Sequence, residues 1–357
     1  MKIIPWWSWA FPLLAWLLLG LKTVMPVSGL LLPLFILGLG GAVFAAVHFA
    51  EVIAHKVGEP FGTLVLAVAV TIIEVALIVS VMLSGGADKA SLARDTVFSA
   101  VMIVCTGVVG ICTLIGAWRH GEQEFKIQGA NGALAVLVAL SVLTMVLPNY
   151  TLSSSGASFS VAQLEFVGLE SLVLYGVFVF VQTVRHRAYF LPDNETADPH
   201  DMALPSTQAV FVSLGLLVVS LVAVVGMAKG LSPTIEAVVA RSGAPESVVG
   251  VVIAAFVLLP ESLAAMRAAR RNQLQTSFNL AFGSAIASIG LTIPVVATVS
   301  ILIGQPLTLG LDQKETVLLA LTMLLSTLTV ATGRTSILQG AIHLAVFAVF
   351  LFFAVVP

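Results

Sequence analysis

The sequence is poor in charged residues. Asp, Glu, Lys and Arg make up 10% of its 357 residues, whereas an ordinary soluble domain carries about 25%. Hydrophobic residues make up 59%, and no polar stretch is long enough to form a separate catalytic domain. The formal net charge of -2 argues against nucleic acid as a partner. The chain is therefore predicted to be an all-α polytopic membrane protein.

Cysteines and catalytic motifs are also scarce. The two cysteines, Cys105 and Cys112, fall on one face of one apolar segment, which favours small buried packing residues over a disulfide or a metal pair. The sequence has no G-x-S-x-G, no P-loop and no H-E-x-x-H. A membrane hydrolase or an ATP-driven pump would have no residues to act with, so we expect neither enzyme activity nor a cofactor.

Long apolar runs, by contrast, fill most of the chain. Hydropathy and helix breakers predict eleven transmembrane helices. Their expected ranges are 6–21, 28–54, 61–83, 95–117, 129–148, 161–184, 207–228, 247–266, 275–303, 315–331 and 336–356. The first run lacks a clear small-x-small cleavage site, so we expect a retained span and not a signal peptide.

One polar stretch, residues 187–206, divides the later spans into two groups of five. We expect an N-terminal helix in 1–27, a first five-helix repeat in 28–186, an acidic linker and a second five-helix repeat in 207–357. The acidic residues of the linker are Asp193, Glu195, Asp198 and Asp201. A solvated loop is the favoured interpretation of this linker, and a regulatory cation sensor is the alternative.

The loops also predict an orientation. With the N-terminus in the cytoplasm, the cytoplasmic side collects ten Lys and Arg residues and the opposite side collects six. Because positive charge favours the cytoplasmic side, we expect a cytoplasmic N-terminus and linker and an external C-terminus.

Glu74 lies in the middle of an apolar segment, residues 64–83. At about 1.5 Å per residue, such a helix spans the hydrocarbon core and places Glu74 near the midplane. A carboxylate at that depth costs several kcal/mol and indicates function. Glu261 lies in a similar segment, and the sequence has no basic residue at mid-span to pair with either glutamate.

The two glutamates occupy equivalent places in the two groups of spans. Because five is odd, the two groups must face the membrane in opposite directions, as in transporters with inverted repeats and a midplane site. Each glutamate lies in the second span of its group, and each third span begins with polar residues. These polar residues are Asp95 and Ser99 in the first group and Asn279 and Ser284 in the second.

Two carboxylates in a low-dielectric site repel each other unless they bind protons or a cation. We therefore expect Glu74 and Glu261 to bind a metal cation or protons in competition. Calcium takes six to eight oxygen ligands, for which the candidates besides the glutamates are Ser99, Ser284, Asn279 and Thr71. Residues expected next to the ligands or on a proton path are Glu51, Pro260, Asp95 and Ser288. Pro260 is included because it removes a backbone hydrogen bond and frees a carbonyl beside Glu261.

Other polar residues have more ordinary interpretations. His48, Glu51 and His55 share one helix face, which is weak support for a transition-metal site and better support for a proton path through Glu51. The residues interpreted as caps or as structural are Glu59, Glu246, Glu165, Glu170, Gln182 and His343.

Several segments together resemble the calcium/cation antiporter (CaCA) superfamily, and specifically its ChaA-type cation/proton antiporters of the bacterial inner membrane. They are HFAEVIAHKVGEPFG at 48–62, IIEVALI at 72–78, LLPES at 258–262, NLAFGSA at 279–285 and TGRTSILQGAIHL at 332–344. The resemblance implies two inverted five-helix repeats after one extra helix, and exchange of Ca²⁺, Na⁺ or K⁺ for H⁺. The glutamates of the family's repeats fall on Glu74 and Glu261, and its serines on Ser99 and Ser284.

The sequence departs from the wider calcium/proton exchangers at G-N-x-x-E, which reads V-T-I-I-E at 70–74 and V-L-L-P-E at 257–261. The missing amides favour a site with fewer fixed oxygens, which would tolerate Na⁺ or K⁺. Ser99 also follows Phe98, where the second repeat has Gly283 before Ser284. We expect inorganic cations and membrane lipid as partners; the oligomeric state stays open, and a cation channel or a non-transporting scaffold are the alternative functions.

Overall fold

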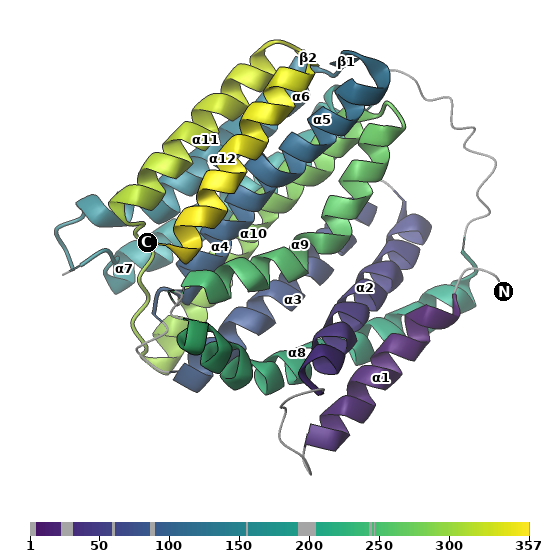
Figure 1. The fold of residues 1–357 in the computed structure, drawn as a ribbon, viewed down its shortest axis with the longest axis vertical. Helices are drawn as coiled ribbons and strands as arrows, with labels where there is room; N and C mark the ends of the chain where they lie inside the picture. Colours follow the sequence, from purple (N-terminus) through teal and green to yellow (C-terminus); the bar gives the residue numbers. More distant parts are fainter. Residues whose placement is uncertain are drawn as a thin grey trace. The chain divides into compact units, whose positions relative to one another are not determined.

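The computed structural model describes residues 5–22, 31–58, 61–85, 90–154, 156–191, 205–242, 245 and 247–356. These residues are almost entirely helical (Figure 1). They form two compact units, one made of Met1–Gly85 with Glu195–Glu246 and the other of Gly86–Asn194 with Ser247–Pro357. Each unit is described in turn.

The first unit is built around helix α2. Its helices are α1 (Trp6–Lys22), α2 (Leu31–Val57), α3 (Phe61–Gly85) and α8 (Thr207–Ser242). α2 packs against each of the other three. Gly38 of α2 allows a close approach of α1, because a Cβ there would lie 2.7 Å from the Leu18 side chain. Small residues of this kind let membrane helices pack closely.

The second unit holds the remaining helices and one short strand pair. Its elements are α4 (Leu92–Met102), α5 (Val109–His120), β1 (Gln123–Glu124), α6 (Ile127–Ser141), α7 (Val161–Phe180), α9 (Ser247–Arg270), α10 (Leu274–Ile303), α11 (Gln313–Ala331), β2 (Arg334–Thr335) and α12 (Ile337–Val355). β1 and β2 pair antiparallel, with Gln123 opposite Thr335. The π-helical turn Ile103–Val108 joins α4 and α5 into one span, and similar turns, Val142–Val146 and Val181–Arg185, extend α6 and α7.

The predicted fold class is confirmed. Each of the eleven predicted spans corresponds to a helical segment in the part of the chain that the structure describes. Nine of these described helices are long and apolar enough to cross a membrane. α8 runs to Ser242 and not to residue 228, because hydropathy marks only the apolar part of a helix and the polar turns that follow continue the same backbone.

The two compact units divide the chain differently from the predicted repeats, since α8 packs with α1, α2 and α3. Packing and internal symmetry are separate properties, so the division into inverted repeats stays a prediction. The acidic linker residues Asp193, Glu195, Asp198 and Asp201 lie outside the described residues, as do the predicted caps Glu59 and Glu246.

Within the second unit, α4 crosses α9 very closely at Gly250. A Cβ at Gly250 would lie 2.8 Å from the carbonyl carbon of Asp95 and 2.9 Å from the nitrogen of Thr96. Side chains do not reach backbone atoms at such distances, so only glycine permits this crossing. It places Asp95 beside the first turn of α9.

Replacing this glycine is therefore expected to destabilise the protein. Gly250→Ala should push α4 away from α9 and lower the free energy of unfolding by about 1–3 kcal/mol, the usual cost of overpacking. Gly176→Ala on α7 is the matched control, because a Cβ there meets no atom within 4 Å. Thermal unfolding of the purified proteins tests this, and equal midpoints for the two variants would contradict the tight crossing.

Candidate cation and proton site

Glu261 meets Ser284 across the α9–α10 pair. The helices are joined by a tight turn at Asn272, which adopts a positive φ of 58°. Glu261 and Ser284 are nearly the same distance along the chain from this turn, so the hairpin brings them to one level. The Ser284 hydroxyl donates a hydrogen bond to Oε2 of Glu261. This contact joins two residues that the sequence predicted to share a site.

The turn of α9 before Glu261 has an altered backbone. The helix continues through Pro260, but proline has no N–H to donate. The carbonyl of Phe256 therefore loses its usual donor, while the Ser262 hydroxyl donates to the carbonyl of Leu258 at 2.7 Å. This freed carbonyl oxygen, about one turn before Glu261, can act as a ligand for a cation.

Two further predicted residues lie on α10. Ser288 is buried one turn after Ser284 and so faces the same side of the helix. Asn279 donates from Nδ2 to the carbonyl of Phe190 at 2.5 Å, and its Oδ1 accepts from Gln275 at 2.9 Å. Nδ2 of Asn279 thus holds α10 to the segment at Phe190, whereas its Oδ1 is paired within α10, and its role as a cation ligand stays a prediction.

Glu74 and Thr71 belong to the first unit. They lie three residues apart on α3, on one face of the helix, and both are buried, with relative exposures of 2% for Glu74 and 7% for Thr71. The polar face of α3 is therefore a buried one. Because Glu74 and Glu261 belong to different units, their pairing stays a prediction.

Glu51 lies on α2 with a mostly exposed side chain, and its Oε2 is 4.0 Å from Nδ1 of His48. Within the described ranges, no three His, Cys, Asp or Glu residues cluster as metal ligands. The H-x-x-E-x-x-x-H pattern therefore does not form a metal site of that size there, and the proton-path role of Glu51 stays a prediction.

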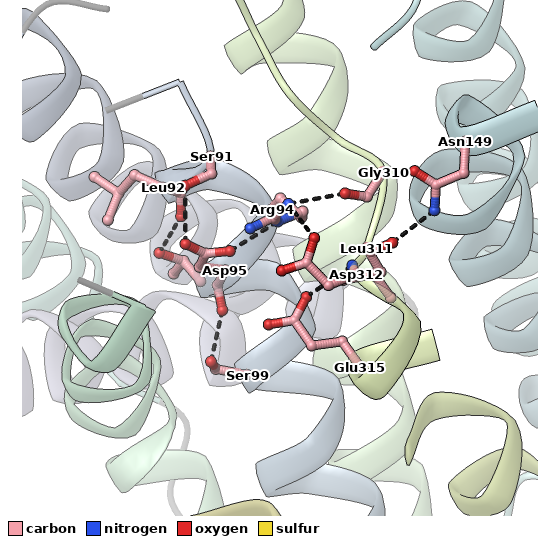
Figure 2. A network of polar contacts seen from close by, with 11 residues as sticks. Ser91, Leu92, Arg94, Asp95, Ser99, Asn149, Gly310, Leu311, Asp312 and Glu315 are labelled. Atoms are coloured by element: carbon pink, nitrogen blue, oxygen red, sulfur yellow. Dashed lines mark hydrogen bonds and ion pairs between the residues drawn. The ribbon is translucent and has the colours of Figure 1, made fainter. Parts of the chain in front are cut away.

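Asp95 belongs to a second polar cluster, which we call the Arg94 network (Figure 2). Nε of Arg94 donates to Oδ1 of Asp95 at 2.8 Å, and Nη1 donates to the carbonyl of Gly310 at 2.8 Å. The same Nη1 lies 4.0 Å from Oδ1 of Asp312. One guanidinium thus joins the first turn of α4 to the connection that precedes α11.

The carboxylates of this network also accept hydrogen bonds at the starts of α4 and α11. Ser91 donates to Oδ2 of Asp95 at 3.0 Å. Asp312 and Glu315 form a capping box at the start of α11, in which the Asp312 N–H donates to Oε2 of Glu315 at 3.3 Å. Arg94, Asp95 and Glu315 are all buried. The cluster therefore holds the start of α4 to the segment before α11 through buried groups of opposite charge.

Ser99 lies beside this network. Its hydroxyl donates to the backbone carbonyl of Asp95 at 2.5 Å, and both residues line a small cavity with Glu315 and Ser247. Asp95 stands opposite Gly250, eleven residues before Glu261, which is about 16 Å along α9. The structure therefore places Asp95 at a different level along α9 from Glu261, and the roles of Asp95 and Ser99 at the cation site stay predictions.

Sequence reasoning did not assign the Arg94 network. Its available signals were the charged pair Arg94–Asp95 at a span start and the D-x-x-E capping pattern of Asp312 and Glu315. The interpretation of the cysteines is confirmed, because Cys105 and Cys112 are buried free thiols. His343 joins the backbone carbonyl of Cys105 at 2.8 Å and the hydroxyl of Thr329 at 2.9 Å, which fits its structural interpretation.

A buried and an exposed Arg–carboxylate pair offer a direct comparison. Arg94→Gln should cost about 3–5 kcal/mol of unfolding free energy, because it leaves buried carboxylates without their cation. Arg334→Gln removes the pair with Glu122, whose side chains are 61% and 58% exposed, and should change the stability little because solvent screens such pairs. Thermal unfolding measures the stability of both variants. Similar losses of stability would show that the buried contacts of Arg94 stabilise the protein no more than the exposed pair does.

This chain is similar to known proteins over most of its length. The model of the family described as "Sodium/calcium exchanger protein" matches residues 27–184 and 212–356. The putative ionic transporter y4hA of Sinorhizobium fredii is 48% identical over 99% of this chain and 97% of its own length. The sodium-potassium/proton antiporter ChaA of Escherichia coli is 35% identical over 96% of this chain and 94% of its own length.

Solved structures share the fold. Native YfkE superposes with a TM-score of 0.75 at 17% identity, covering 97% of this chain and all of YfkE. The H⁺/Ca²⁺ exchanger CAX gives a TM-score of 0.69 at 14% identity, covering 97% and 87%. Since the family match includes both groups of five spans, the chain is an integral membrane protein that belongs to the sodium/calcium exchanger family, as its resemblance to ChaA-type antiporters predicted.

Proposed function

We propose that the protein is a secondary-active antiporter, not an enzyme, which exports Ca²⁺, Na⁺ or K⁺ in exchange for H⁺ across a bacterial inner membrane. The names of two relatives support H⁺ as the ion that is exchanged for the metal cation. The E. coli relative is named a sodium-potassium/proton antiporter. A relative from Aphanothece halophytica, 23% identical over 86% of both chains, is named a Ca²⁺/H⁺ antiporter.

The observation that carries the proposal is the contact between Glu261 and Ser284. A hydroxyl is neutral, so this hydrogen bond leaves the charge of an ionised carboxylate uncompensated inside an apolar helix. Such a charge is costly in the membrane. Binding a proton or a metal cation removes that cost, and the two compete for the same oxygens.

Glu74 is the second proposed site for a proton or a cation, because it is a carboxylate buried on the apolar helix α3 with Thr71 one turn away. Alternating access between the two membrane faces then couples the ions. With the glutamates empty and charged, reorientation is too costly, whereas the loaded protein reorients with either protons or the cation bound. Exchange of the cation for protons follows from this restriction, and it needs no energy source besides the gradients of the two ions.

The choice of cation depends on the number of fixed oxygens. Calcium takes six to eight oxygen ligands. If each glutamate binds through one oxygen, the two glutamates, the Ser284 and Thr71 hydroxyls and the carbonyl freed by Pro260 supply about five, with water for the remainder. Monovalent cations need less neutralising charge, so we include Na⁺ and K⁺ as substrates. The excess of Lys and Arg in alternate loops supports a cytoplasmic N-terminus and a periplasmic C-terminus.

Neutralising either glutamate should abolish exchange. We expect Glu74→Gln and Glu261→Gln to reduce cation-driven proton flux in proteoliposomes to background, measured with Ca²⁺, Na⁺ and K⁺ added separately. Ser284→Ala should weaken the apparent cation affinity about tenfold, since a hydrogen bond to a charged group contributes roughly 1.5–3 kcal/mol. Glu165→Gln, on the exposed face of α7, is the matched control and should transport normally.

Each alternative has its own outcome in this assay. Full exchange in either glutamine variant would refute the two-glutamate mechanism. Cation current without stoichiometric proton movement would indicate a channel. No flux in the wild-type protein with any of the three cations would indicate a non-transporting scaffold.

A further inference from the structure

Glu170 places a carboxylate far inside the apolar part of α7. The helix begins at Ser160, whose hydroxyl and Gln163 form a capping box. Glu170 follows ten residues later, about 15 Å along the axis, which is half the thickness of a bilayer core. Its side chain is half-buried. Oε2 is fully buried and has no hydrogen-bond partner among the described residues.

Glu170 also borders a cavity between α7 and the segment that follows α6. The cavity, which we call the α7 pocket, has a volume of about 540 Å³. Pockets for small molecules have volumes of roughly 300–1,000 Å³, apolar walls and a few polar groups. The walls of the α7 pocket include Leu143, Leu147, Phe159, Phe166 and Val167. Glu170 supplies its one ionisable group.

The α7 pocket lies on a face of the second unit that is suited to lipid. Phe166, which borders the pocket, is 68% exposed, and its neighbour Leu169 is 62% exposed. Apolar side chains this exposed on a membrane-spanning helix are expected to face hydrocarbon. A ligand that dissolves in the bilayer can therefore reach the pocket from the side.

We propose that the α7 pocket binds a lipophilic amine. The hydrocarbon part of the amine fills the apolar walls, and its nitrogen donates a hydrogen bond to the carboxyl group of Glu170. Charge complementarity selects this class of ligand, because Glu170 is the ionisable residue among those that line the pocket, and an unpaired carboxylate is costly beside apolar walls. The amine enters from the lipid as the free base, and the carboxyl proton moves to the nitrogen, so that only a proton changes place.

The depth of Glu170 argues against a lipid headgroup as the occupant. A headgroup amine lies near the level of the helix start, about 15 Å from Glu170, and cannot reach Oε2 from there. The pocket is also distinct from the proposed transport site, because neither Glu261 nor Ser284 lines it. The proposal for Glu170 therefore does not depend on antiport.

Equilibrium binding of radiolabelled decylamine to the full-length protein in phosphatidylcholine nanodiscs tests the proposal, with empty nanodiscs as background. Glu170→Gln should weaken binding about ten- to a hundredfold, the range expected for a lost charge-assisted hydrogen bond. Glu165→Gln, on the same helix but outside the pocket, should bind decylamine normally. Decanol, which has the same chain without the amine, should compete at least tenfold more weakly than decylamine.

Several results would overturn the proposal. Unchanged decylamine binding to Glu170→Gln would show that the carboxylate does not hold the amine. Equal competition by decanol would indicate apolar filling only, and displacement by phosphatidylethanolamine in the nanodisc would indicate a lipid headgroup. If Glu170→Gln does not fold, Ala162→Trp places an indole in the same pocket. That variant should also lose binding, and normal binding to it would equally refute the site.

Discussion

Every polar atom inside an apolar helix needs a partner, and this requirement governs the structure more than any other. Many hydroxyl groups meet it within their own helix. Thr96, Thr144 and Ser171 each donate to the carbonyl four residues earlier, at 2.7–2.8 Å. An ionised carboxylate only accepts hydrogen bonds, so it cannot use a carbonyl in this way. Each membrane carboxylate must therefore find a donor side chain or N–H group, bind a proton or bind a cation.

The second unit meets this requirement in three different ways. Asp95 has a resident cation in Arg94, whose guanidinium donates directly to it. Glu261 has a neutral hydroxyl from Ser284, which satisfies one oxygen and leaves the charge for a mobile ion. Oε2 of Glu170 has no hydrogen-bond partner among the described residues. The role of the carboxylate thus depends on its neighbours. It is structural in Asp95, part of the proposed transport site in Glu261 and the proposed ligand anchor in Glu170.

Local sequence was sufficient to predict the helices, because length and hydropathy alone determine which segments can cross a bilayer. It was also sufficient for the contact of Glu261 with Ser284, since the short turn at Asn272 aligns two residues close in sequence. The Arg94 network could not be predicted, because Arg94 and Gly310 are 216 residues apart. The π-helical turns carry no comparable sequence signal. Ser99 was predicted as a cation ligand; its hydroxyl donates to the backbone carbonyl of Asp95, and its role at the cation site stays a prediction.

Protonation explains why serine suits Glu261 and arginine suits Asp95. A hydroxyl both donates and accepts, so Ser284 can donate to the carboxylate and accept from the protonated acid without leaving its place. A guanidinium only donates and stays charged, so it favours one ionisation state and holds its partner in it. Proton exchange requires a carboxyl group whose surroundings accommodate both states. Within the second unit, this condition favours Glu261 over Asp95 as the group that titrates during transport.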